Sequence, residues 1–183
     1  DVSSLNSRHA FGEIYETILK SLQSAGNAGE FYTPRAVTDF MAAMLAPKLG
    51  ERIADFACGT GGFLTSALNQ LAPQIKTVED RRQYNSALYG CEKKALPFLL
   101  CVTNMLLHDL DDPVIMHGNS LSRPVQDYQE GDLFDVILMN PPYGGSELES
   151  IKANFPLELR SSETADLFMA LILSLIHISE PTR

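Results

Sequence analysis

The segment Asn140-Pro141-Pro142-Tyr143 fixes the point at which a buried strand must end. It follows the apolar run at residues 134–139, which is typical of a buried strand. Neither proline has an N–H, each holds φ at about −65°, and each restricts the residue before it. The amide of Asn140, the carbonyl of Pro141 and the ring of Tyr143 are therefore expected together. This corner suits a planar ring with an amino group, although a plain turn is the simpler interpretation.

Residues 53–64, Ile-Ala-Asp-Phe-Ala-Cys-Gly-Thr-Gly-Gly-Phe-Leu, indicate a strand, a glycine-rich turn and the start of a helix. Glycines let a ligand approach the main chain, and the helix start supplies free N–H groups with a positive dipole end. The turn matches neither the dinucleotide fingerprint nor the P-loop. Asp55, at the end of the strand, favours a cationic ligand over a polyphosphate.

Strands alternate with helices along the chain, which predicts a parallel sheet with helices on both faces. Thr33 is a candidate cap for a helix with Pro34 in its first turn, and Thr164 for a last helix with Asp166 near its start. Ligands of such sheets bind at the carboxyl ends of the strands, where Asn140 is expected. The expected strands are 52–56, 88–92, 114–116 and 136–139, and the expected helices are 11–22, 34–46, 62–71, 95–107 and one from 164.

The two motifs resemble those of S-adenosylmethionine-dependent amino-methyltransferases. Residues 29–35, Gly-Glu-Phe-Tyr-Thr-Pro-Arg, narrow the resemblance to the modification (M) subunit of type I DNA restriction–modification systems. The order of the three motifs matches, and the resemblance extends from about residue 11 to residue 171. It implies an α/β, Rossmann-like methyltransferase fold with a mostly parallel sheet, helices on both faces, and truncation at the C-terminal side.

The resemblance also implies site residues. The catalytic residues would be Asn140, Pro141, Pro142 and Tyr143. The residues that bind S-adenosylmethionine would be Glu30, Phe31, Tyr32, Thr33, Pro34, Arg35, Asp55, Ala57, Cys58, Gly59, Thr60, Gly61, Gly62, Glu92 and Asn119. No metal is expected. The alternative for Phe31 and Tyr32 is core packing, and the alternative for Arg35 is a structural ion pair.

Glu92 and Asn119 follow the second and third expected strands. A carboxylate at Glu92 can accept hydrogen bonds from both ribose hydroxyls, although an exposed Glu before a Lys-Lys pair is the plainer interpretation. Asn119 stands where this family often has Asp, and either side chain can accept a hydrogen bond from the amino group of the cofactor's adenine.

The implied reaction is methyl transfer to the N6 amino group of an adenine in duplex DNA. The adenine must be flipped out of the helix, and Tyr143 would stack on it. Enzymes that methylate the side-chain amide of glutamine, some RNA methyltransferases and single-chain restriction–modification enzymes share the Asn-Pro-Pro-Tyr motif. A catalytically silent partner that keeps the fold is a further alternative.

A net charge of −9 argues against a DNA binder that acts alone, because affinity for DNA comes largely from Lys and Arg. The basic, sequence-reading surface is therefore expected elsewhere. The resemblance implies a specificity subunit and a restriction nuclease subunit as partners, in the cytoplasm of a bacterium or archaeon. The three cysteines are expected to be reduced and mostly buried, and no apolar stretch has the length of a membrane span.

We divide the chain into a helical lead-in with the cofactor-wrapping segment (1–34), a partial catalytic core (35–172) and a tail (173–183). The tail resembles a translated sequencing adaptor, and we interpret it as non-native. The polar residues 144–162 are expected to form a mobile connection, either a lid over the substrate or a surface loop.

We predict that the isolated chain is poorly soluble or inactive, because a truncated sheet exposes an edge that can pair with other chains. Size-exclusion chromatography and titration with S-adenosylmethionine would test this. A monodisperse, cofactor-binding preparation of residues 1–183 would contradict it.

Overall fold

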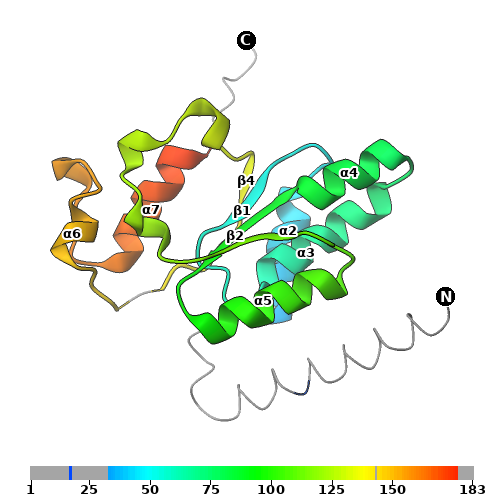
Figure 1. The fold of residues 1–183 in the computed structure, drawn as a ribbon, viewed down its shortest axis with the longest axis horizontal. Helices are drawn as coiled ribbons and strands as arrows, with labels where there is room; N and C mark the ends of the chain where they lie inside the picture. The colour runs from blue at the N-terminus through cyan, green and yellow to red at the C-terminus, as the bar shows by residue number, and fades with distance from the viewer. Residues whose placement is uncertain (1–16, 18–32, 143, 177–183) are drawn as a thin grey trace.

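The expected strands form one parallel sheet in the order β3-β2-β1-β4 (Figure 1). The computed structural model describes residue 17 and residues 33–142 and 144–176. β1 (Ile53–Asp55) lies inside the sheet and pairs with β2 (Leu88–Glu92) on one side and β4 (Val136–Ile137) on the other. β3 (Val114–His117) pairs with the other side of β2. All four carboxyl ends therefore lie at one edge of the sheet.

Helices cover both faces of the sheet, as predicted (Figure 1). Because successive strand residues point to opposite faces, Ile53 belongs to one core and Ala54 to the other. The first core contains side chains from α2, α3, α4 and α5, and the second is built mainly on α7. These helices are α2 (Arg35–Leu45), α3 (Gly62–Leu71), α4 (Val78–Ser86), α5 (Ala95–Leu107) and α7 (Thr164–Leu175).

The predicted bounds of α3, β2 and α5 are confirmed, whereas both predicted helix caps are wrong by one residue. Pro34, with φ −52° and ψ 136°, occupies the position before α2. The hydroxyl of Thr33 instead accepts a hydrogen bond from Asn140. Glu163 precedes α7, and Thr164 is already helical, with its backbone N–H donating to the carbonyl of Gly145.

The helix α4 was not predicted. Its only buried residue is Tyr84, so it lacks the apolar stripe by which the other helices were found. A capping box does mark its start, because Thr77 accepts from the N–H of Asp80 while the Asp80 carboxylate accepts from the N–H of Thr77. The capping box was the signal in the sequence from which α4 could have been predicted.

Residues 144–162 do not form a single open connection. They contain the short helices α6 (Glu149–Lys152) and η5 (Leu157–Leu159), and Phe155 between them is 1% exposed. Asn154 donates from its side chain to the carbonyl of Leu121. The second half of the segment is therefore held against the α7 core, which the expectation of a mobile loop did not anticipate.

The helix α7 continues past residue 172, where we placed the end of the core. Leu175 is fully buried, and Ile176 forms a parallel bridge with Phe134 beside β4. The predicted helix 11–22 lies outside the described residues. Within the described ranges, no helix has both the length and the apolar character needed to cross a bilayer.

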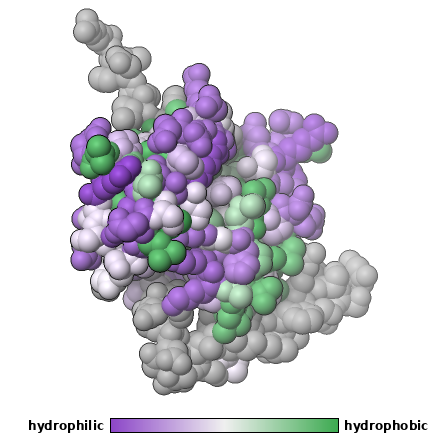
Figure 2. All heavy atoms as spheres, turned by 60° about the vertical axis from the view of Figure 1, so that its left-hand side comes forward, coloured by the Kyte–Doolittle hydropathy of each residue, from purple (hydrophilic) through white to green (hydrophobic). Residues whose placement is uncertain are grey.

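The surface of the described residues is mixed, with apolar side chains gathered in patches among hydrophilic ones (Figure 2). On α2, Val37, Phe40 and Met44 are exposed at a spacing of three and four residues, which places them on one side of the helix. On α5, Leu96 and Leu99 are also exposed. These helices thus present apolar side chains outward as well as toward the core.

We predict that Gly90→Ala destabilises the fold. A Cβ at Gly90 would lie 2.7 Å from Cδ1 of Ile115 and 3.0 Å from Cδ1 of Leu64, both in the first core. Both atoms are the ends of flexible side chains and can shift, so the overpacking should cost about 1 kcal/mol, the low end of the usual range. Denaturant unfolding would measure the loss. Gly131→Ala is the matched control, because a Cβ there meets nothing within 4 Å, and equal stability of the two variants would contradict the prediction.

Candidate functional site

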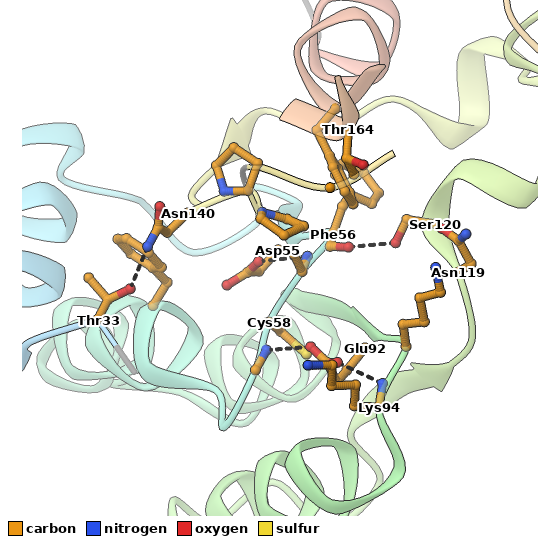
Figure 3. A pocket seen from close by; sticks show the side chains of 18 of the residues that line it. Thr33, Asp55, Phe56, Cys58, Glu92, Lys94, Asn119, Ser120, Asn140 and Thr164 are labelled. Carbon is orange, nitrogen blue, oxygen red and sulfur yellow. Dashed lines mark hydrogen bonds between the residues drawn. The ribbon is translucent and has the colours of Figure 1, made fainter. Parts of the chain in front are cut away.

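A cavity of about 610 Å³ opens at the carboxyl edge of the sheet (Figure 3). Its volume lies within the range of about 300–1,000 Å³ that is common for ligand pockets. Its walls come mainly from the loops that follow the four strands, with further residues from α7 and from the segment before α2. The predicted site residues among its lining are Thr33, Asp55, Ala57, Cys58, Gly59, Thr60, Gly62, Glu92, Asn119, Asn140, Pro141 and Pro142. The proline corner and the glycine turn therefore face the same cavity.

The glycine turn owes its shape to two residues in the left-handed region. Gly59 has φ +54°, and Gly61, at the start of α3, has φ +85°. A Cβ on Gly61 would lie 2.9 Å from Sγ of Cys101. Gly61 lies behind the cavity wall rather than in it, and its missing side chain lets α5 approach the turn.

The cysteines belong to the packing around this turn. Cys58, Cys91 and Cys101 are all buried and free, as predicted. The Sγ atoms of Cys58 and Cys101 lie 3.6 Å apart. That contact and burial raise the pKa of the Cys58 thiol, so it is held in the unreactive protonated form.

Glu92 joins the glycine turn to the end of β2. Its Oε2 accepts from the N–H of Gly59 at 2.9 Å, and its Oε1 accepts from the N–H of Lys94 at 2.7 Å. The side chain is held in the cavity wall (Figure 3). Each carboxylate oxygen can accept more than one hydrogen bond, so the ribose role stays a prediction that this geometry permits.

Asp55 is the most deeply buried carboxyl group of the site, with 1% of its surface exposed. Its Oδ1 accepts from the N–H of Ala57 at 3.0 Å. Burial raises the pKa of Asp55 to about 8, and the nearby charge of Glu92 adds to the increase. A cation in the cavity would favour the ionised form, which agrees with the cationic ligand expected from the sequence.

Asn140 is held by a residue from the other end of the described chain. Its Nδ2 donates to Oγ1 of Thr33 at 3.3 Å, across 107 positions of sequence. Because the amide nitrogen donates to Thr33, the amide oxygen Oδ1 points away from Thr33. This bond joins the Phe-Tyr-Thr-Pro and Asn-Pro-Pro-Tyr motifs. The other predicted residues of these motifs, Glu30, Phe31, Tyr32 and Tyr143, lie outside the described residues.

Pro34 and Arg35 were predicted to hold the cofactor, but neither lines the cavity. The guanidinium of Arg35 donates to Oγ1 of Thr65 at 2.7 Å, on α3. The hydroxyl of Ser66 lies 2.8 Å from Oγ1 of Thr38. These bonds fix α2 on α3, so the contact of Arg35 seen here is structural, although it is a hydrogen bond to a hydroxyl and not the expected ion pair.

Several lining residues were not predicted, among them Lys93, Glu147, Thr164 and Phe168. Lys93 follows Glu92 directly, so the strand end was the signal that could have found it. Glu147, Thr164 and Phe168 belong to no motif and reach the cavity only through the packing of residues 144–148 and α7.

A family model for N-6 DNA methylases matches residues 6–181. The chain belongs to the N-6 DNA methylase family. The family resemblance read from the motifs is therefore confirmed, and the parallel sheet with helices on both faces is the Rossmann-like fold predicted for it.

Two known proteins resemble this chain over most of its length. It is 54% identical to the EcoEI type I restriction enzyme methylase subunit of Escherichia coli over 96% of its own length and 36% of that subunit. A solved structure from Vibrio vulnificus YJ016, described as a modification subunit of a type I restriction enzyme, matches with a TM-score of 0.84 and 47% identity. That match covers 91% of this chain and 35% of the other.

A third match is a solved structure of a type I restriction–modification system, described in terms of complex assembly and conformational transition. Its TM-score is 0.80 at 38% identity, over 89% of this chain and 33% of the other. The chain thus spans about a third of the length of the type I proteins it matches.

We predict that the effect of Asp55→Asn on stability depends on pH. A carboxyl group whose pKa is about 8 when folded and 3.8 otherwise destabilises the fold increasingly as the pH rises between these values. The variant lacks this penalty, so its free energy of unfolding should rise relative to the parent between pH 5 and pH 8. Denaturant titrations at several pH values would measure the difference, and a constant difference would contradict the raised pKa.

Proposed function

We propose that the chain is the catalytic part of a type I modification subunit, which transfers a methyl group from S-adenosylmethionine to the N6 amino group of adenine in duplex DNA. The observation that carries the proposal is the placement of Asn140. It lies three residues after the end of β4, lines the same cavity as the glycine turn, and has its amide nitrogen held by Thr33. Its amide oxygen is thereby directed away from Thr33 as an acceptor.

The chemistry of the cavity fits this cofactor. The buried Asp55 carboxyl group suits a cationic centre, Glu92 offers oxygens to ribose hydroxyls, and Asn119 offers an amide oxygen to an adenine amino group. The glycine turn lines the cavity together with Asp55 and Glu92. When bound, S-adenosylmethionine supplies a methyl group on a positively charged sulfonium.

Asn140 and Pro141 would act on the target base through hydrogen-bond acceptance. The lone pair of an aromatic amine is delocalised into its ring, so the amine is a poor nucleophile. Acceptance of its two N–H hydrogens by Oδ1 of Asn140 and the carbonyl of Pro141 would favour a pyramidal nitrogen with a localised lone pair. These acceptors would also stabilise the positive charge that develops on the nitrogen. Once the N–C bond has formed and the S–C bond has broken, the nitrogen would lose a proton to water, so no strong base is needed.

The base must leave the duplex to reach this corner, because its amino group is inaccessible inside the stack. Tyr143 would stack on the extruded ring, a contact worth about 1–3 kcal/mol. The chemistry of the cage alone also suits a glutamine amide or an RNA base. The similarity to type I methylase subunits over 96% of this chain favours DNA.

The proposal includes a specificity subunit and a restriction nuclease subunit as partners. A chain with a net charge of −9 is poorly suited to reading DNA by itself. The exposed apolar stripe of α2 (Val37, Phe40, Met44) offers a surface for contacts with other parts of such an assembly. The similarity to a solved type I assembly supports this arrangement, and we place the enzyme in the cytoplasm, where its DNA lies.

We predict that Asn140→Ala lowers methyl transfer by at least about a hundredfold, the scale seen when a positioned polar group of an active site is removed. Cofactor affinity should stay nearly unchanged, because the amide acts on the base. Incorporation of tritiated methyl groups into duplex DNA by the assembled complex would measure transfer, and calorimetric titration would measure affinity.

Asn69→Ala is the matched control, since Asn69 is exposed on α3 and outside the cavity. It should leave both readings unchanged. Retained methyl transfer in Asn140→Ala would refute the role of Asn140, and a parent protein that does not bind S-adenosylmethionine would refute the cofactor assignment.

A further inference from the structure

One carboxylate ties together the loops that follow three strands of the sheet. Glu147, which comes after β4, accepts from Nζ of Lys93, after β2, at 3.0 Å. It also accepts from Nδ2 of Asn119, after β3, at 3.1 Å. The side chain of Glu147 is only 10% exposed although its segment lies at the surface. All three residues line the cavity.

These contacts determine which way the Asn119 amide faces. Its Oδ1 accepts from the backbone N–H of Leu121 at 3.0 Å, and its Nδ2 donates to Glu147. A backbone N–H can only donate and a carboxylate can only accept. The two neighbours together favour this orientation. A flipped amide would place donor against donor at Leu121 and acceptor against acceptor at Glu147.

We propose that Glu147 is a positioning residue that sets the adenine preference of the cofactor site through Asn119. The inference rests on the proposed function, since it concerns the adenine end of the same cofactor. By occupying the NH2 group of Asn119, Glu147 leaves the second lone pair of Oδ1 as the group offered to the cavity. That acceptor matches a 6-amino group and repels a 6-oxo group.

The same contact gives a reason for Asn at position 119, where the resemblance leads one to expect Asp. A carboxylate at 119 would lie about as far from the Glu147 carboxylate as the amide nitrogen does now, 3.1 Å, and the two charges would repel. With Gln at 147 the conflict disappears, because the Gln NH2 group can donate to the carboxylate at 119 while its oxygen accepts from Lys93. Asp at position 119 should therefore be tolerated only when position 147 is changed to Gln at the same time.

The first test compares two nucleoside thioethers, S-adenosylhomocysteine and its 6-oxo analogue S-inosylhomocysteine. Calorimetric titration of the complete subunit should show that the parent prefers the 6-amino compound by at least about tenfold, the penalty for an unpaired acceptor. In Glu147→Gln the oxygen of Gln is engaged by Lys93 and its NH2 group faces Asn119, so it no longer supports this orientation of the amide. The preference should fall by at least about threefold, within the range of coupling between contacting residues.

Glu149→Gln is the matched control. Glu149 is also a glutamate and lies two residues after Glu147. It pairs with Lys152, its side chain is 89% exposed, and it does not line the cavity. The Glu149→Gln variant should prefer the 6-amino compound by the same factor as the parent. An unchanged preference in Glu147→Gln would overturn the proposal, because a residue with a purely structural role would weaken both ligands alike.

The second test uses the exchange of the two positions. Asn119→Asp alone should weaken S-adenosylhomocysteine binding by about tenfold, and the double variant Asn119→Asp, Glu147→Gln should return to within about threefold of the parent. Additive losses would overturn the proposal, and if a single variant fails to fold, a double variant that still binds about tenfold or more weaker than the parent would overturn it as well. A parent that binds neither thioether would overturn the proposed function instead, so the two failures are distinguishable.

Discussion

Parallel pairing of β1 with both of its neighbours is the constraint on which the site depends. Ile53 pairs with Leu88 of β2 and with Val136 of β4, which brings the ends of the three strands to the same edge. Asp55, Glu92 and Asn140 then face one cavity although they are far apart in sequence. A slip of one residue would exchange the two faces of a strand, and its apolar residues would leave their cores.

Three carboxyl groups share this cavity, and each is accommodated differently. Glu92 accepts two backbone N–H groups, and Glu147 accepts from Lys93 and Asn119. Asp55 is buried with a hydrogen bond from the N–H of Ala57, and its pKa is raised. Of the three, Asp55 therefore gains most from a cation. Glu92 and Glu147 instead accept hydrogen bonds that fix the positions of loops, so their carboxylates hold the shape of the cavity as well as contribute negative charge to it.

Much of the fold and of the site could be predicted because the signals are local. The apolar periodicity of α5 and the glycines at the start of α3 gave the correct bounds. The prolines placed Asn140 just past β4, although this strand ends at Ile137 and not at the predicted residue 139. The helix α4 was missed because burial of Tyr84 alone leaves no stripe to detect. Arg35 was assigned to the cofactor by its motif, whereas its guanidinium is directed to Thr65 on α3.

The sequence by itself determined where strands stop and where the chain can turn. Proline lacks an N–H and glycine lacks a Cβ, and these properties act within a residue or two. Only the tertiary structure decided which polar groups meet. Asn140 is hydrogen-bonded to Thr33, 107 positions away in the sequence, and Asn119 to Glu147, 28 positions away. A hydrogen bond needs its two atoms within about 3 Å, and such proximity between distant residues arises only when sheet and helices pack.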